Sequence, residues 1–247
     1  MSNNFFGKLI IALAIFSLCE GYAFAQGIHE IKFKGTFPFG DFKKISETRE
    51  MENDIIKSGA AVGAGIGYRY HFNIASGLGL TIGGDILWNM TTKKYRDICK
   101  DPKPSDTLGP KNQTPPQYLN FPFVVGVNYR LPLGSSNNWF AFFGAYGGLN
   151  VHYTTSTGWK NFEVRYKPVL SPCLSLEAGI NYRQYSLSIE LMTLGQPTIT
   201  GNGNEDFQCF HILDKKRDML LGNIVFSYKL IKQKREWKPT RKTILEL

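Results

Sequence analysis

Apolar and polar residues alternate strictly over long stretches of this chain. From Gly59 to Phe72 the even-numbered positions are apolar, while the odd-numbered ones are mostly glycine and include Arg69 and His71. After a short turn, the even-numbered positions from Leu78 to Met90 are again mostly apolar. A period of two over this length is typical of a β-strand with two different faces. The two stretches therefore predict a β-hairpin.

The same alternation recurs in residues 31–37, 119–131, 139–153, 170–182, 185–191 and 220–230, which brings the predicted strands to eight. Short connections alternate with long polar ones, which are residues 43–58, 92–117, 154–168 and 195–218. We therefore predict an all-β fold, an eight-stranded antiparallel up-and-down barrel.

The content of the polar face indicates which face of the barrel points outward. A soluble lipocalin-like barrel would put this face in water, with a charged or hydroxyl side chain at most of its positions. Here it is rich in glycine with one or two charges per strand, as in a crowded lumen. The apolar face ends in aromatic residues on the short-turn side, as in an interfacial girdle: Tyr68, Tyr70, Phe72, Tyr129, Trp139, Tyr182, Tyr185, Phe226 and Tyr228. This favours a transmembrane β-barrel.

The two ends of the chain predict export and a periplasmic tail. Lys8, the apolar run Leu9 to Leu18 and Ala23-Phe24-Ala25 have the layout of a secretory signal peptide. We expect residues 1–25 to be the signal peptide, 26–231 the barrel and 232–247 a basic tail. No second long apolar segment follows, which excludes a helical membrane protein. In bacterial outer-membrane barrels an even strand count places both termini in the periplasm and the long connections outside the cell.

The formal net charge of +9 is concentrated in the tail and its approach. An exported chain meets little nucleic acid, so nucleic acid is not an expected partner. The expected partners are outer-membrane lipid and, through the tail, an acidic envelope protein or a cell-wall polymer.

Charged residues on the polar face allow two interpretations, a selectivity pathway or a network of ion pairs that fills the barrel. Eight strands enclose an interior only wide enough for side chains, which favours the ion-pair network. The predicted members are Lys32, Arg69, Asp85, Arg130, Glu177, Glu190 and Lys229.

The segment Gln117-Tyr118-Leu119-Asn120-Phe121-Pro122-Phe123 resembles the fourth strand of the PorT-like outer-membrane β-barrel family of Bacteroidetes. Members often carry a Tyr-Leu-x-x-Pro-apolar signature there, matched here by Tyr118, Leu119 and Pro122. The resemblance implies an eight-stranded barrel in the outer membrane. Family function is heterogeneous, and PorT itself is implicated in type IX secretion. One departure is that such barrels usually end with an aromatic residue, whereas Tyr228 is internal here.

The sequence predicts no catalytic, cofactor or metal site. Barrel enzymes on the lipid face need a nucleophile and a base within hydrogen-bond reach, but His71 and His152 are predicted to point inward. The segment Gly201 to Asp206 is rich in oxygen ligands but lacks EF-hand spacing. Cys99 and Cys209, both in long connections, are predicted to form a disulfide, with Cys173 unpaired on the lumen face.

The sequence interpretation leads to three functional hypotheses. The leading one is a non-enzymatic integral outer-membrane barrel that presents long extracellular loops, with a structural or partner-binding role. The alternative is a PorT-like component of type IX protein secretion. The third is a small-solute channel.

Overall fold

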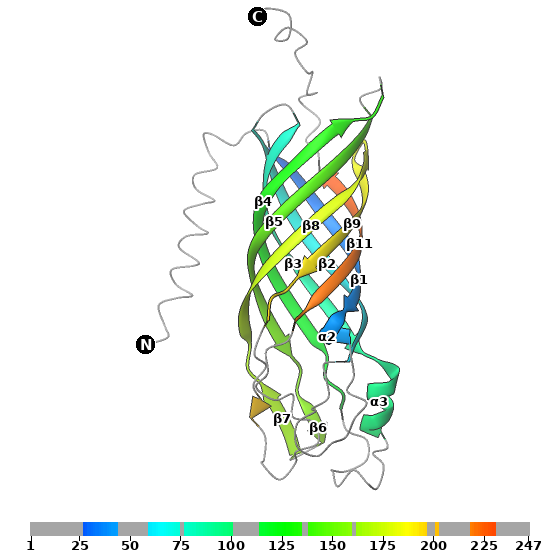
Figure 1. The fold of residues 1–247 in the computed structure, drawn as a ribbon, viewed down its shortest axis with the longest axis vertical. Helices are drawn as coiled ribbons and strands as arrows, with labels where there is room; N and C mark the ends of the chain where they lie inside the picture. Colours follow the sequence, from blue (N-terminus) through cyan, green and yellow to red (C-terminus); the bar gives the residue numbers. More distant parts are fainter. Residues whose placement is uncertain are drawn as a thin grey trace, which may run out of the picture.

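The computed structural model describes residues 27–43, 59–74, 77–100, 114–134, 138–159, 162–196, 201–202 and 218–230. Eight antiparallel strands close into one barrel in the order β1-β11-β9-β8-β5-β4-β3-β2 (Figure 1). The fold class predicted from the alternation is therefore confirmed. The barrel strands are β1 (Ile28–Phe39), β2 (Ala60–Asn73), β3 (Leu78–Thr91), β4 (Tyr118–Pro132), β5 (Trp139–Thr154), β8 (Val169–Tyr182), β9 (Tyr185–Thr193) and β11 (Leu220–Leu230).

The short connections all lie at one end of the barrel, which we call the short-turn end. The tightest joins β8 to β9 through Arg183 and Gln184, and Tyr182 pairs with Tyr185 across it. Arg183 has a positive φ of 53°, which a two-residue hairpin turn requires. The first residue of β1, Ile28, pairs with His71 near the short β2–β3 turn, and the neighbouring His29 pairs with Leu230, the last residue of β11. Both strand ends therefore lie at this same end.

The opposite end, the loop end, carries more structure than the sequence predicted. Its connections hold the helices α2 (Gly40–Lys43) and α3 (Lys93–Lys100) and a small sheet of β6 (Thr157–Trp159), β7 (Phe162–Tyr166) and β10 (Gly201–Asn202). Figure 1 shows α3 and β6–β7 beyond this end of the barrel. The expectation that these connections are polar loops was incomplete. The period-two pattern in β7 lasts only five residues, too short to distinguish it from a loop.

The outer face of the barrel is apolar and the inner face is polar, the reverse of a soluble protein. Leu174 and Ile189 are 63% and 64% exposed, while Arg69 and Glu190 are fully buried. Large apolar side chains cover the outside of every barrel strand. A continuous apolar surface of this size is not stable in water, and it matches the hydrocarbon layer of a bilayer. The chain is therefore a transmembrane β-barrel.

Aromatic rings gather on the outside at the short-turn end. The Trp139 and Tyr182 ring centroids lie 4.5 Å apart, and Tyr185 lies 5.4 Å from Tyr228. Tyr70 differs from the other predicted girdle residues because it is only 9% exposed, with His29 packed 4.8 Å from its ring. Among the helices of the described residues, none has the length and hydropathy needed to span a bilayer.

Candidate functional site

Four charged side chains from four strands form the central cluster of the lumen: Lys34, Arg69, Asp85 and Glu190. The Arg69 guanidinium donates two hydrogen bonds to the Asp85 carboxylate, at 2.8 and 2.7 Å. The Lys34 ammonium bridges Asp85 Oδ2 at 2.8 Å and Glu190 Oε2 at 2.6 Å. These side chains are all inaccessible to solvent. Two cations and two carboxylates thus neutralise one another.

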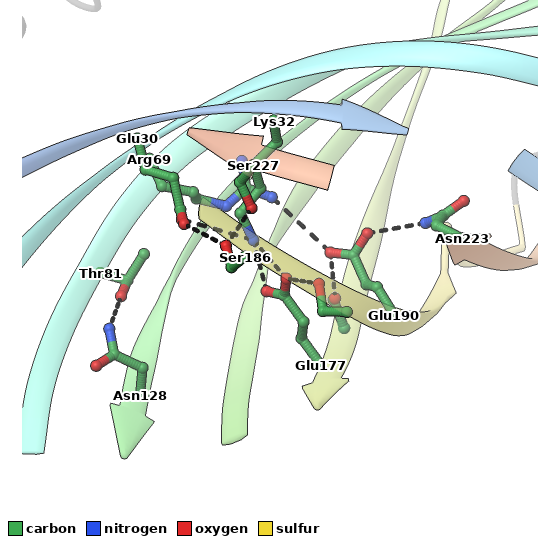
Figure 2. Close-up of polar contacts among 12 residues, drawn as sticks. Glu30, Lys32, Arg69, Thr81, Asn128, Glu177, Ser186, Glu190, Asn223 and Ser227 are labelled. Carbon is green, nitrogen blue, oxygen red and sulfur yellow. Dashed lines mark hydrogen bonds and ion pairs between the residues drawn. The ribbon is translucent and has the colours of Figure 1, made fainter. Parts of the chain in front are cut away.

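Neutral donors complete the coordination of Glu190. The Ser175 hydroxyl donates to Oε1 and the Asn223 amide donates to Oε2, both at 2.8 Å. Figure 2 shows the Asn223 contact, which approaches Glu190 from β11. A buried carboxylate with both oxygens engaged avoids most of the cost of leaving water.

A second ion pair lies across the lumen, where Lys32 of β1 meets Glu177 of β8. The Lys32 ammonium lies 2.7 and 2.6 Å from the two carboxylate oxygens (Figure 2). The Ser188 hydroxyl donates to Oε1 at 2.6 Å. The Tyr146 ring lies close to both groups, 6.0 Å from Lys32 Nζ and 5.9 Å from Arg69 Cζ. At these distances it stabilises both cations through its π face.

Nearer the short-turn end, His71 joins Glu30 to Thr81. His71 Nε2 lies 2.8 Å from Glu30 Oε2, and Nδ1 lies 2.9 Å from both Thr81 Oγ1 and the Asn128 amide. The carboxylate only accepts, so Nε2 carries the proton and Nδ1 is the acceptor nitrogen of the ring. Hydroxyl, imidazole and carboxylate follow the order of a catalytic triad. However, the Thr81 residue is fully buried, so its hydroxyl is not accessible to a substrate in this structure.

Two predicted members of the ion-pair network, Arg130 and Lys229, form no ion pair with a carboxylate among the described residues. Lys229 donates to the Asn181 amide oxygen at 2.6 Å. The Arg130 side chain forms no hydrogen bond or ion pair with any residue in the described ranges. Both lie at the short-turn end, and the carboxylates of the strands are engaged deeper in the lumen.

An apolar cap closes the lumen at the loop end. Phe42 of α2 is fully buried and its ring packs 5.3 Å from that of Tyr118, which stacks on His152 at 6.1 Å. The same buried cluster also includes Ala60, Leu87, Val124, Tyr146, Tyr166, Cys173, Met192, Leu194, Met219 and Leu221. Cys173 is a free thiol, 1% exposed, on the inner face.

The family-like motif lies at the start of β4. Tyr118 points inward and Leu119 is half-buried. Pro122 is buried in the strand, where it pairs with Asn150 of β5. On the other side, the β3–β4 register omits Asp85 and Ile86, which lie opposite Pro122 and Phe121. A proline has no N–H to donate, so a break in the ladder on one side is expected.

The sequence interpretation missed two members of the network, Glu30 and Lys34. Both share the inner face of β1 with Lys32 at period two, a signal that was visible. The predicted partners Cys99 and Cys209 are not tested, because the Cys99 side chain and all of Cys209 lie outside what the structure describes. No group of three or more potential metal ligands occurs among the described residues.

Comparisons with known proteins give a similar architecture and no family. No protein-family model matches the chain, and no curated protein matches its sequence. Similar solved structures include neisserial surface protein A (TM-score 0.47, 11% identity), OprG from Pseudomonas aeruginosa (0.43, 11%) and Ail of Yersinia pestis (0.39, 6%). Each covers 83% of this chain, which in turn covers 96%, 95% and 97% of theirs. The resemblance to the Bacteroidetes family stays a prediction.

Proposed function

We propose that this protein is a non-enzymatic integral outer-membrane barrel that anchors and presents the long connections of its loop end, in a structural or partner-binding role. The observation that carries the proposal is the burial of the lumen charges. Lys32, Lys34, Arg69, Asp85, Glu177 and Glu190 are each at most 4% exposed. A water-filled channel would expose the charges that line it. The packed interior of this barrel therefore supports a structural role and not a water-filled channel.

The proposed location rests on the apolar belt together with the predicted signal peptide. A closed barrel pairs its strands with one another and leaves no open sheet edge, which is what allows strands to cross a bilayer. With the predicted orientation, the short-turn end faces the periplasm and the loop end faces the medium. Residues 232–247 then form a basic periplasmic tail, suited to an acidic envelope protein or a cell-wall polymer.

Epitope insertion tests the proposed orientation. One tag is inserted after Pro104, in the long connection before β4, and a matched tag after Ser135, in the short connection between β4 and β5. Antibody added to intact cells should label the first protein, and label the second only after the outer membrane is permeabilised. Labelling of the Ser135 tag on intact cells, with none at Pro104, would show the opposite orientation and overturn the proposal.

The alternative function, a PorT-like component of type IX secretion, makes a different prediction. A secretion component should co-purify with other export proteins from crosslinked outer membranes, and this contact should weaken when Lys232, Lys234 and Arg235 are changed to glutamine. A presenting barrel should retain its surface ligand regardless of these changes. The third function, a small-solute channel, is disfavoured by the buried charges.

A further inference from the structure

Two cationic side chains at the mouth of the barrel at the short-turn end, Arg130 and Lys229, form no ion pair with a carboxylate among the described residues. Arg130 extends from β4 and Lys229 from β11, which lie on opposite sides of the closed barrel. Lys229 is only 5% exposed, so water screens its charge poorly.

Glu30 is the carboxylate nearest to this mouth, but both of its oxygens are already engaged. His71 binds Oε2 at 2.8 Å, and the Ser186 hydroxyl donates to Oε1 at 3.2 Å. Lys32 lies 3.9 Å from Oε2 and adds a further cation. Within the described ranges, then, no carboxylate forms an ion pair or a hydrogen bond with Arg130 or Lys229.

We propose that this mouth is a binding site for a small soluble oxyanion, held between the Arg130 guanidinium and the Lys229 ammonium. A guanidinium presents a planar fork that fits two oxygens of a phosphate or a carboxylate. An ammonium has three donors, of which the Asn181 contact uses one. Both groups therefore have hydrogen-bonding capacity left for an anion.

Access and surroundings also suit a soluble anion rather than a lipid. Arg130 is half-buried and lies two residues from the end of β4, beside the mouth at the short-turn end. It faces the lumen, with the buried Phe142 opposite it on β5. The apolar wall lowers the local dielectric and strengthens an ionic hydrogen bond.

The test measures binding of inorganic phosphate and of acetate to the full-length protein, folded in a phosphate-free neutral detergent, by calorimetry. Binding of either anion supports the site, and the stronger one identifies its geometry as tetrahedral or planar. Each of Arg130→Gln and Lys229→Met should weaken binding about tenfold or more, since a hydrogen bond to a charged group contributes roughly 1.5 to 3 kcal/mol. The matched control is Arg183→Asn, which removes a cation at the same end but outside the lumen.

A second readout separates binding from folding. The anion should raise the unfolding temperature of the parent protein and of the Arg183→Asn variant, but not that of Lys229→Met. The Lys229→Met variant should itself fold, because it removes a buried cation that has only an amide partner. Failure of both anions to bind the parent, or equal binding by all variants, would overturn the proposal.

Discussion

Every buried charge in the lumen depends on its neighbours, because no solvent compensates for a lost partner. Lys32 has Glu177 as its close partner and Glu30 only at 3.9 Å. The central cluster is redundant by comparison, since Lys34 contacts two carboxylates and Asp85 contacts two cations. A single substitution in the Lys32–Glu177 pair therefore leaves a buried charge with fewer remaining partners than one in the central cluster.

Glu177→Ala should destabilise the barrel by about 3 kcal/mol, because it leaves the Lys32 ammonium buried without a close carboxylate. The measurement is urea unfolding in lipid vesicles. The matched control is the double variant Lys32→Met with Glu177→Leu, which replaces both charges with apolar groups and should recover most of the loss. If the double variant is as unstable as Glu177→Ala, volume rather than charge explains the effect.

Glycines on the inner face determine which large side chains the lumen can hold. A Cβ atom on Gly67 would lie 2.0 Å from Asp85 Oδ1, and one on Gly144 would lie 2.1 Å from the Tyr146 hydroxyl. The strands therefore place a glycine beside each of these long polar groups. This explains why the polar face is rich in glycine, the feature by which the sequence indicated a crowded lumen.

Gly67→Ala should displace the Asp85 carboxylate from Arg69 and Lys34 and cost about 1 to 3 kcal/mol, the usual range for overpacking. Gly35→Ala is the matched control, since a Cβ there would meet only the Phe37 ring, at 3.8 Å. Unfolding of both variants under the same conditions gives the comparison. Equal stability of the two proteins would show that the lumen adapts to the added methyl group.

Strand positions could be predicted from the sequence because one face of each strand is apolar and the other faces the polar lumen. This difference imposes a strict period of two. The predicted strand 139–153 corresponds to β5, Trp139–Thr154, and the Arg183–Gln184 turn was predicted to the residue. Ion-pair partners could not be predicted in the same way. Lys32 and Glu177 are 145 residues apart and meet across the lumen, so their contact depends on barrel closure and strand stagger.

The loop-end elements were missed for a related reason. The cap residue Phe42 follows Gly40, whose positive φ of 56° lets the chain leave β1 and form α2. In the sequence Phe42 is one apolar residue next to a polar connection. That Phe42 covers the lumen becomes visible only in the structure, where α2 turns inward.

Phe42→Ala should open this cap and expose Cys173, which belongs to the same buried cluster. The rate of maleimide labelling at Cys173, followed by peptide mass spectrometry, should rise several-fold over the parent. The stability cost should approach the roughly 3 to 5 kcal/mol typical of a buried Phe→Ala change. Phe39→Ala is the control, because Phe39 lies on the exposed outer face of the same strand end. An unchanged labelling rate would contradict the cap.

Three groups of buried side chains, one after another along the barrel axis, close the barrel to solutes. The apolar cap lies at the loop end, the charged clusters fill the middle, and the His71 network lies towards the short-turn end. Barrels of eight strands have interiors only about as wide as opposed side chains, whereas aqueous channels need about sixteen strands. A solute would therefore have to break the central cluster, whose four charges are inaccessible to solvent.

Single-channel recording in planar bilayers tests this closure directly. The purified parent protein should show no steady conductance. Glu177→Ala, recorded in parallel, frees Lys32 but leaves the central cluster and the cap intact, so it should at most produce brief, irregular openings. A porin of sixteen strands in the same bilayer provides the positive control. Steady, ion-selective conductance in the parent would reject the closed interior, and it would make the small-solute channel the leading function in place of the presenting barrel.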